Sequence, residues 1–284
     1  MKDTKVIIIV TVLMFQQIIS GEKIELPEYV ISLEDNAFDD QYVGCEETME
    51  MKAKKLLVQE RAINLNFSKV WENAEIKWNG ITPNNKKMDM LFEVAVIAYT
   101  TETNKIYPTF NRAVRECCES LDAYMNNFHF KALHFYLTRA VQMLKGSCKN
   151  VYRGISVKQQ PDGTGEMRFG QFASTSLNQI VARKFTKKSG TLYKVYTCEG
   201  AAIEHLSVFP REKEVLIPPY EVFDVSMFSD SEGLNNVELK SKKTSKSRFN
   251  CAYLEANKAA VPGHLTTILF PGITLFTLIF QAYF

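Results

Sequence analysis

The chain has 284 residues, 46% of them hydrophobic, and its 34 Lys and Arg residues nearly balance its 32 Asp and Glu residues. This length suits one large domain or two small ones, and the near-neutral charge gives no general nucleic-acid-binding footprint, so no nucleic acid is expected among the partners. Six cysteines are too few for a small disulfide-dense scaffold.

The N-terminus carries a targeting pattern. Residues 1–21 combine Lys2 and Lys5 with an apolar run at residues 6–15 and small residues near its end. This arrangement predicts a secretory signal peptide. The apolar run is shorter than the roughly 20 residues that a membrane-spanning helix requires.

The C-terminal residues 265–284 are mostly apolar, carry no charge and lack the basic flank that usually accompanies a spanning helix. Small residues at 256–260 and a short spacer precede this tail, a combination typical of a glycosylphosphatidylinositol (GPI) anchor signal. We therefore expect residues 258–284 to be removed, with Asn257 as the attachment residue or Ala256 as its alternative. The protein would then lie on the extracellular face of the plasma membrane. A tail-anchored helix is the competing interpretation.

Between these signals, residues 22–257 have the length of one domain. Cysteines outside the cell tend to pair, so disulfides are expected here. The single N-glycosylation sequon of this domain, Asn66-Phe67-Ser68, predicts glycosylation at Asn66.

The first half of the domain predicts helices. Strong helix formers occupy residues 45–62, and Val70, Ala74 and Trp78 recur at the spacing of one helix face. Further helices are expected at residues 88–100, at about 108–118 and at 129–144.

His134 lies on the last of these helices, beside Phe135 and Tyr136. For a histidine in this setting, a structural role is favoured over catalysis. The chain has four histidines and none forms a ligand-like cluster with Cys or a carboxylate, so a catalytic metal is not expected.

The second half of the domain predicts strands. Alternating, β-branched segments predict strands at residues 151–157, 191–198 and 214–228, the last of them divided by Pro218-Pro219. Residues 180–185 predict one or two helical turns, and the basic, serine-rich run 240–248 predicts a solvated loop or an edge strand. Helices followed by strands indicate an α+β fold, with a helical N-terminal half packed on a β-rich C-terminal half.

Burial in strands does not explain three polar features of this second half. Arg153 lies in the middle of a predicted strand, where a guanidinium needs a carboxylate or phosphate partner, and its planar fork suits a diphosphate. A structural ion pair is the alternative. Gly154 either lets a ligand approach the backbone or marks a bulge. The hydroxyls of Ser174-Thr175-Ser176 suit either a ribose or the cap of the next helix.

The third feature is Glu212-Lys213-Glu214, the only Glu-x-Glu in the chain. If the segment is extended, the two carboxylates point to one face with their Cα atoms roughly 6.5 Å apart. Paired carboxylates can stabilise a developing positive charge or take a proton from a nucleophile. A charged turn before a core strand is the alternative. No Gly-rich phosphate loop follows a strand, so neither a Rossmann nor a P-loop nucleotide site is supported.

These motifs resemble a known family. Tyr152-Arg153-Gly154, Phe172-Ala173-Ser174-Thr175-Ser176 and Glu212-Lys213-Glu214 are similar, in this order, to the Arg, Ser-Thr-Ser and Glu-x-Glu elements of arginine-specific mono-ADP-ribosyltransferases. These vertebrate cell-surface enzymes are related in fold to bacterial ADP-ribosylating toxins. The likeness spans about residues 36–251, includes Phe110-Asn111-Arg112-Ala113-Val114-Arg115, and is nearest to the GPI-anchored T-cell type.

The resemblance implies a transferase that uses NAD as co-substrate, requires no metal and modifies arginine on surface or secreted proteins. In such an enzyme Arg153 would hold the NAD phosphates, and Gly154 would meet the nicotinamide amide through its backbone. Ser174 would hydrogen-bond the nicotinamide ribose, and Phe185 would stack on the nicotinamide ring.

The resemblance also divides the glutamates. Glu214 would bind the ribose 2′-hydroxyl and stabilise the ribosyl cation, whereas Glu212 would orient and deprotonate the acceptor guanidinium. A glutamine in place of Glu212 would indicate hydrolysis in this family, so Glu212 favours transfer. An NAD glycohydrolase on the same scaffold and a catalytically silent surface recognition protein are the alternatives.

The family pattern further implies disulfides between Cys45 and Cys251 and between Cys148 and Cys198. Cys117 and Cys118 lie outside this pattern. They are free, pair with another chain or tune redox sensitivity, and the sequence does not choose among these roles.

Overall fold

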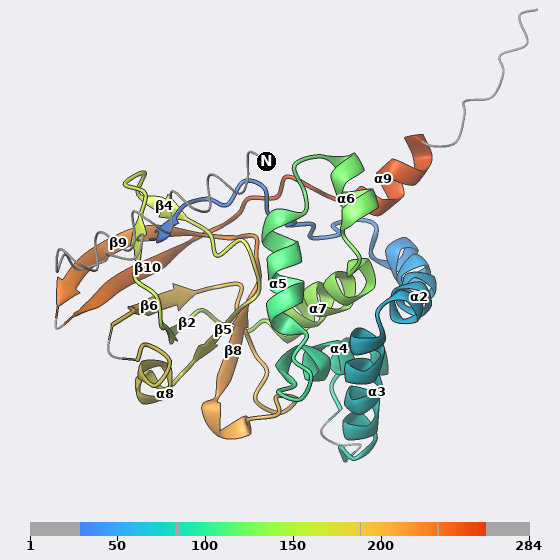
Figure 1. Ribbon diagram of the computed structural model, residues 1–284, viewed down its shortest axis with the longest axis horizontal. Helices are drawn as coiled ribbons and strands as arrows, with labels where there is room; N and C mark the ends of the chain where they lie inside the picture. Colours follow the sequence, from blue (N-terminus) through green and yellow to red (C-terminus); the bar gives the residue numbers. More distant parts are fainter. Residues whose placement is uncertain (1–28, 83–85, 188, 232, 260–284) are drawn as a thin grey trace, which may run out of the picture.

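The computed structural model describes residues 29–82, 86–187, 189–231 and 233–259. The signal peptide expected at residues 1–21 and residues 260–284 of the expected anchor signal lie outside this part of the chain. Within it, no helix combines the length and the apolar content that a membrane span needs. Figure 1 shows a helical half and a sheet half side by side, the predicted α+β fold.

Among the described residues, the helical half has six helices: α2 (Glu46–Ile63), α3 (Leu65–Asn79), α4 (Met90–Thr100), α5 (Tyr107–Glu116), α6 (Leu121–Asn127) and α7 (Lys131–Leu144). Five of them coincide with predicted helices to within a few residues. The exception, α6, has seven residues and a side-chain cap, in which Ser120 Oγ accepts from the backbone N–H of Ala123 at 3.1 Å. Its brevity leaves too few turns for an apolar periodicity to show.

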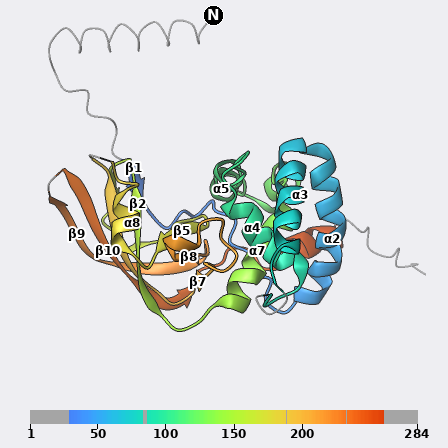
Figure 2. The same ribbon diagram turned by 90° about the horizontal axis from the view of Figure 1, so that it is seen from below.

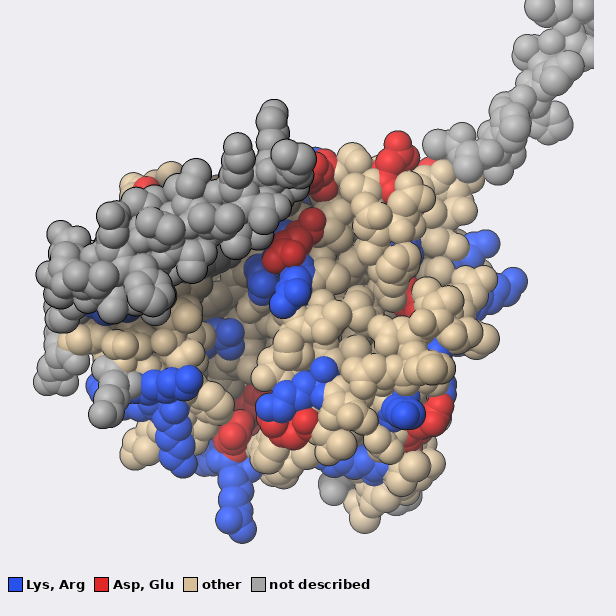
Figure 3. Space-filling view, viewed as in Figure 1, with Lys and Arg blue, Asp and Glu red and all other residues tan. Residues whose placement is uncertain are grey.

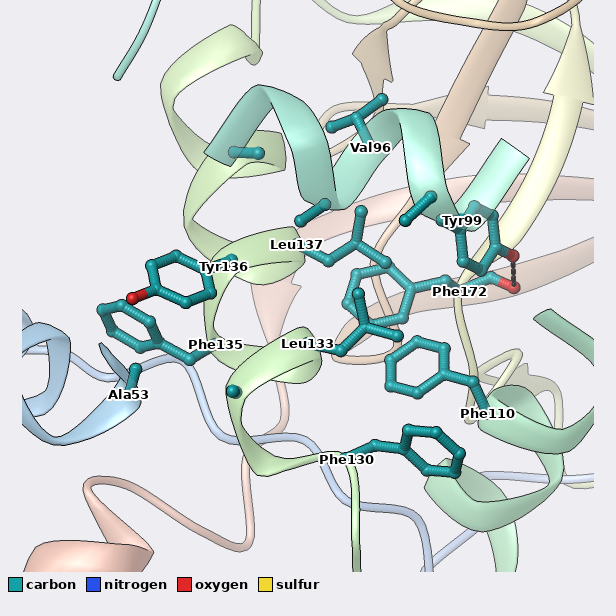
Figure 4. Packing of buried hydrophobic residues seen from close by; sticks show 14 of the residues in the cluster. Ala53, Val96, Tyr99, Phe110, Phe130, Leu133, Phe135, Tyr136, Leu137 and Phe172 are labelled. Carbon is teal, nitrogen blue, oxygen red and sulfur yellow. Dashed lines mark hydrogen bonds between the residues drawn. The ribbon is translucent and has the colours of Figure 1, made fainter. Parts of the chain in front are cut away.

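Helix α7 is the centre of the helical core. Most of its side chains are buried, because helices and the sheet edge cover it on nearly all sides. Figure 4 shows Leu133 and Leu137 of α7 packed beside Phe110 of α5 and Phe172, which directly precedes β5. The helical layer and the sheet half therefore share one hydrophobic core at the point where the chain turns from helices to strands.

His134 is part of this core rather than of a site. Its ring is fully buried, with the Tyr42 hydroxyl 2.8 Å from Nδ1. Burial lowers the pKa of His134 to about 3, so the ring is neutral at physiological pH. The structural role predicted for this histidine is consistent with this environment.

The sheet half is built on eight strands in the order β4-β9-β10-β6-β2-β5-β8-β7. In chain order they are β2 (Lys149–Ile155), β4 (Glu166–Met167), β5 (Ala173–Ser176), β6 (Thr191–Thr197), β7 (Ala201–Ala202), β8 (Glu214–Ile217), β9 (Glu221–Ser231) and β10 (Leu234–Ser245). A separate parallel pair joins β1 (Tyr29–Ile31) to β3 (Gln159–Pro161). The part of the chain that the structure describes has three more short helical elements: α8 (Gln179–Arg183), η2 (Pro210–Glu212) and α9 (Ala252–Ala259). Apolar residues of the strands, among them Val151, Tyr193 and Phe223, form a second core.

The interpretation of residues 240–248 needs a correction. Residues up to Ser245 belong to β10, which is an interior strand between β9 and β6 and not an edge strand. Pairing with β6 ends at Lys240, and beyond it the strand pairs only with β9. The exposed lysines of residues 240–248 therefore lie where β10 extends past β6. This position explains the polar composition of the run.

All three cysteine pairs form disulfides. Cys45 is bonded to Cys251 and Cys148 to Cys198, the pairs that the family resemblance implied. The first of these ties the start of α2 to the chain just before α9, 206 residues later. Cys117 and Cys118, for which the sequence left several roles open, are bonded to each other between α5 and α6.

Candidate active site

A cleft of about 480 Å³ opens between the two halves of the molecule. The helical half contributes residues of α4, α5 and the segment between them, and the sheet half contributes β2, β5, α8 and the turn before β8. In Figure 3 both basic and acidic side chains border the hollow near the centre of this face. All six residues with expected roles line this cleft: Arg153, Gly154, Ser174, Phe185, Glu212 and Glu214.

Antiparallel pairing of β5 with β8 brings the Ser-Thr-Ser and Glu-x-Glu motifs together. Ser176 lies opposite Glu214 in the register, and Thr175 Oγ1 donates to the Val215 carbonyl at 2.6 Å. Ser176 Oγ donates to the Glu212 carbonyl at 2.5 Å and accepts from the Asn178 N–H at 2.9 Å. The last two hydroxyls of the motif therefore hold the strands and the turn before α8, whereas the cap of that helix is Asn178, whose Oδ1 accepts from the Ile180 N–H at 2.9 Å. The Ser174 hydroxyl differs from these two, because its partner is the side chain of Glu214, which lines the cleft.

Glu214 is the inner carboxylate of the cleft. It begins β8, is 7% exposed, and accepts a hydrogen bond from Ser207 Oγ at 2.8 Å. Burial raises the pKa of Glu214 above its ordinary value, and the hydroxyls of Ser174 and Ser207 partly offset this increase. A buried carboxylate with oxygens facing a cleft is suited to a ligand hydroxyl and a developing positive charge.

Glu212 is the outer carboxylate, and its backbone differs from the extended conformation expected. It ends the short helix η2, and Lys213 follows with φ of 47° in the left-handed region. The extended conformation expected for this segment is therefore wrong. Both carboxylates still border the cleft, because the turn carries Glu212 around its rim. Burial and then the charge of Glu102 raise the pKa of Glu212, whereas Lys184 lowers it.

Arg153 is held by one hydrogen bond, from Nη1 to the Ser174 carbonyl at 2.8 Å. In the part of the chain that the structure describes, no carboxylate forms an ion pair with it. Burial lowers the pKa of Arg153 from its ordinary value, although the group stays a cation at any physiological pH. The structural ion pair considered from the sequence is thus absent among these residues, and the guanidinium retains donors for an anionic ligand.

Gly154 has a structural reason to lack a side chain. A Cβ atom at this position would lie 1.9 Å from the Ala182 carbonyl oxygen, which belongs to α8. The glycine therefore lets α8 pack directly on β2, and this packing places Phe185 beside the cleft. Phe185 is 52% exposed and Phe209, across from it before η2, is 40% exposed. Two accessible aromatic side chains that line the same cleft suit a binding surface.

The cleft includes residues to which the sequence assigned no role. Tyr99 donates to the Phe172 carbonyl at 3.0 Å (Figure 4), and Asn111 donates to the same carbonyl at 3.0 Å. Arg115 donates to Gln171, and both line the cleft together with Arg112 and Glu102. Asn111, Arg112 and Arg115 lie in the stretch 110–115 that carried the family resemblance, so its polar residues were the available signal.

The cleft thus has cations, Arg153, Arg112 and Arg115, as well as carboxylates, Glu212, Glu214 and Glu102. This composition suits a substrate that bears a diphosphate and develops positive charge at the reacting carbon. A glycosyl donor such as a dinucleotide has both properties. Among the described residues, no group of three or more His, Cys, Asp or Glu side chains is arranged to hold a metal ion.

Comparison with known proteins agrees with this class of site. The profile of the NAD:arginine ADP-ribosyltransferase family matches residues 31–247, and the chain belongs to this family. Human ecto-ADP-ribosyltransferase 5 is 42% identical over 261 residues, which cover 85% of this chain and 88% of the relative. Mouse T-cell ecto-ADP-ribosyltransferase 2 is 42% identical over 228 residues, or 79% of this chain and 78% of the relative.

The solved structures include similar proteins. The crystal structure of the eucaryotic mono-ADP-ribosyltransferase ART2.2 superposes with a TM-score of 0.71 at 41% identity, covering 79% of this chain and 99% of that one. A mutant of ART2.2 in complex with NAD superposes with the same TM-score at 39% identity and the same coverage. The protein is therefore an NAD-dependent ADP-ribosyltransferase with the ADP-ribosyltransferase fold, and NAD is its co-substrate.

The two predicted modification sites lie away from the cleft. Asn66 is exposed in the first turn of α3, and its Nδ2 donates to the Asn104 carbonyl at 3.2 Å. Asn257 is exposed in α9, and its Nδ2 donates to the Tyr253 carbonyl at 2.6 Å. Attachment of a glycan or an anchor at either residue stays a prediction.

Proposed function

We propose that this enzyme transfers ADP-ribose from NAD to arginine side chains of extracellular or cell-surface proteins and releases nicotinamide. The observation that carries the proposal is the position of the two glutamates. Glu214 is buried in the cleft and Glu212 is half-buried at its rim, while Arg153 lines the same cleft with unsatisfied donors. One carboxylate is thus available to the NAD ribose and the other to an acceptor that enters from solvent.

Several residues of the cleft act in the donor half of the reaction. Arg153 binds the NAD diphosphate through its free donors, and Ser174 hydrogen-bonds the nicotinamide ribose. Phe185 stacks on the nicotinamide ring, and the backbone of Gly154 contacts the nicotinamide amide. Arg115 adds a second positive charge near Arg153 for the diphosphate.

The bond between ribose C1′ and the nicotinamide nitrogen breaks, and its electron pair leaves with nicotinamide. Nicotinamide departs as a neutral molecule, so no general acid is needed. C1′ becomes oxocarbenium-like, and the Glu214 carboxylate stabilises this charge while it binds the 2′-hydroxyl. Glu212 takes a proton from the acceptor guanidinium, whose nitrogen then forms the new bond to C1′.

Hydrolysis by the same scaffold is the competing function. Water enters any open cleft, and an acceptor arginine is favoured over it only if a carboxylate both binds and deprotonates the guanidinium. The half-buried position of Glu212 at the rim supports arginine transfer. A silent recognition protein would not require a buried carboxylate beside an arginine with free donors.

Labelled NAD and agmatine, an arginine-like acceptor, separate these functions. Label on agmatine supports transfer, whereas nicotinamide with free ADP-ribose supports hydrolysis. We expect Glu212→Gln to lose transfer and keep NAD cleavage, and Glu214→Gln to lower both by about 1000-fold. Glu47→Gln, at an exposed position in the first turn of α2, is the matched control. Equal loss of both activities in Glu212→Gln would contradict the division between the glutamates.

We further propose that residues 22–257 form the mature catalytic domain, secreted through residues 1–21 and attached at Asn257 by a GPI anchor that replaces residues 258–284. The uncharged C-terminal tail and the ecto-enzyme names of the relatives support this location. Phosphatidylinositol-specific phospholipase should release the protein from intact cells. Retention of the protein on the treated cells would favour a spanning tail.

A further inference from the structure

A second hollow, a groove of about 430 Å³, adjoins the cleft on its outer side. It lies between α8 and the turn that contains η2, and it is lined by Val181, Lys184, Phe185, Val208, Phe209, Pro210, Arg211 and Glu212. Val181, Phe185, Phe209 and Glu212 also line the cleft. The groove is therefore a continuation of the cleft that begins at the outer carboxylate.

The groove combines an apolar lining with positive charge. Lys184 and Arg211 are both exposed, and among the described residues neither forms an ion pair with a carboxylate. Figure 3 shows basic side chains gathered over α8 and over the turn before β8, next to the hollow. Unpaired cations beside exposed phenylalanines are complementary to a segment with apolar and acidic side chains.

The groove begins where an acceptor protein would reach the outer carboxylate, Glu212. An acceptor arginine that reaches Glu212 from solvent belongs to a protein chain. The residues on either side of that arginine therefore continue along the surface at the rim of the cleft. Lys184 is close enough to Glu212 for its charge to act on the pKa of that carboxyl. Such interactions fade beyond about 10 Å, which is the reach of about three extended residues. Lys184, Arg211 and Glu212 line the same groove, so an acidic residue within about three positions of the arginine is within reach of the two cations.

We propose that the groove selects acceptor proteins in which the target arginine has an acidic residue, with an apolar residue beside it, within about three positions. This inference rests on the proposed arginine transfer. Glu212 binds the guanidinium, Phe209 contacts the apolar side chain, and Lys184 and Arg211 pair with the acidic one. The two cations thus act as specificity residues for the acceptor and take no part in cleavage of NAD.

The test uses three peptides, each with one arginine and one leucine, that differ only in an Asp, Ala or Lys two positions from the arginine. Exposed ion pairs contribute modestly, so we expect kcat/KM to be about fivefold higher for the Asp peptide than for the Lys peptide, and the ratio to shrink in high salt. The double variant Lys184→Gln, Arg211→Gln should reduce the ratio to about one. Rates are divided by the agmatine rate at the same pH, because the loss of Lys184 also acts on Glu212.

The double variant Lys52→Gln, Lys55→Gln is the matched control, because it removes two charges from exposed positions on α2. It should keep the wild-type preference. A wild-type enzyme that labels agmatine but treats the three peptides alike would overturn the inference alone, and so would a preference that survives in the groove variant. A raised KM for NAD in the groove variant, with the peptide preference unchanged, would show instead that the cations serve the dinucleotide. No label on agmatine at all would overturn the proposed transfer and this inference with it.

Discussion

Two arginines, Arg168 and Arg153, show how similar residues serve different ends in this protein. Arg168 is 1% exposed and every nitrogen has a protein partner: Nη1 bonds Asp39 at 2.6 Å and the Lys246 carbonyl, Nη2 the Glu34 carbonyl and Nε the Leu33 carbonyl. Arg153 has a single bond, to the Ser174 carbonyl. Arg168, whose nitrogens are all paired with protein acceptors, ties the N-terminal segment to the sheet. Arg153, which keeps unpaired donors, faces a cleft.

The same contrast between structural and functional groups exists among the buried carboxylates. Asp39 and Asp40 are fully buried. Asp39 accepts from the backbone N–H groups of Arg248 and Phe249, and Asp40 from those of Cys251 and Ala252, which ties both ends of the domain together. Glu214 is nearly as buried, but its partners are the side-chain hydroxyls of Ser207 and Ser174, and it faces the cleft. Structural and functional charged side chains in this protein therefore differ less in burial than in how fully protein groups satisfy their hydrogen-bonding capacity. We call this property saturation.

The largest expected effect is on stability. Arg168→Met leaves Asp39 buried without a cation, and loss of one partner of a buried pair costs about 3–5 kcal/mol. Denaturant unfolding of the disulfide-intact protein measures this loss. The double variant Arg168→Met, Asp39→Asn should recover part of it, because the uncompensated charge is gone. A loss under about 1 kcal/mol would show that saturation does not indicate a structural role.

Arg153→Gln should have the opposite profile. Removal of a charge-assisted contact with the diphosphate should lower kcat/KM for NAD about 100-fold, since such bonds contribute about 1.5–3 kcal/mol each. The free energy of unfolding should change by no more than about 1 kcal/mol, because the native protein loses one hydrogen bond. Steady-state kinetics and unfolding of the same preparation check both statements. Destabilisation as large as that of Arg168→Met would end the distinction between the two arginines.

The pH dependence of activity should report on Glu214. Catalysis needs its carboxylate, and burial raises its pKa above the ordinary value of 4.5. NAD cleavage should therefore fall about tenfold per pH unit below that raised pKa, and recover on return to neutral pH. Circular dichroism at each pH confirms that the fold is retained. Constant activity down to pH 4.5 would show that Glu214 is not the charge that the reaction requires.

The smallest expected effect concerns Glu102, whose charge raises the pKa of Glu212. Glu102→Gln should let Glu212 ionise at lower pH, so the ratio of transfer to hydrolysis should rise at the acidic end of the profile by about twofold. NAD cleavage without acceptor should keep its profile, because Glu214 is unchanged. A shift of both profiles together would place Glu102 with the donor half of the site.

Local patterns predicted most of the helices and strands, since amphipathic periodicity is a property of neighbouring residues. They failed where tertiary packing decides the conformation. The short α6 depends on a cap and one buried tyrosine, and β10 is interior because a distant strand, β6, pairs with its first part. The extended Glu-x-Glu was a local expectation as well, and the left-handed Lys213 overturned it.

For the site, the sequence by itself determined the chemistry: an arginine, a serine motif and two glutamates, in an order that resembles one family of enzymes. Only the tertiary structure decided how these residues divide the work. Ser176 supports the backbone of Glu212, and Gly154 makes room for α8. Glu214 lies inside the cleft and Glu212 at its rim, where a basic groove begins. The physical reason is that hydrogen-bond saturation depends on strands that are far apart in the chain, and no local pattern reports it.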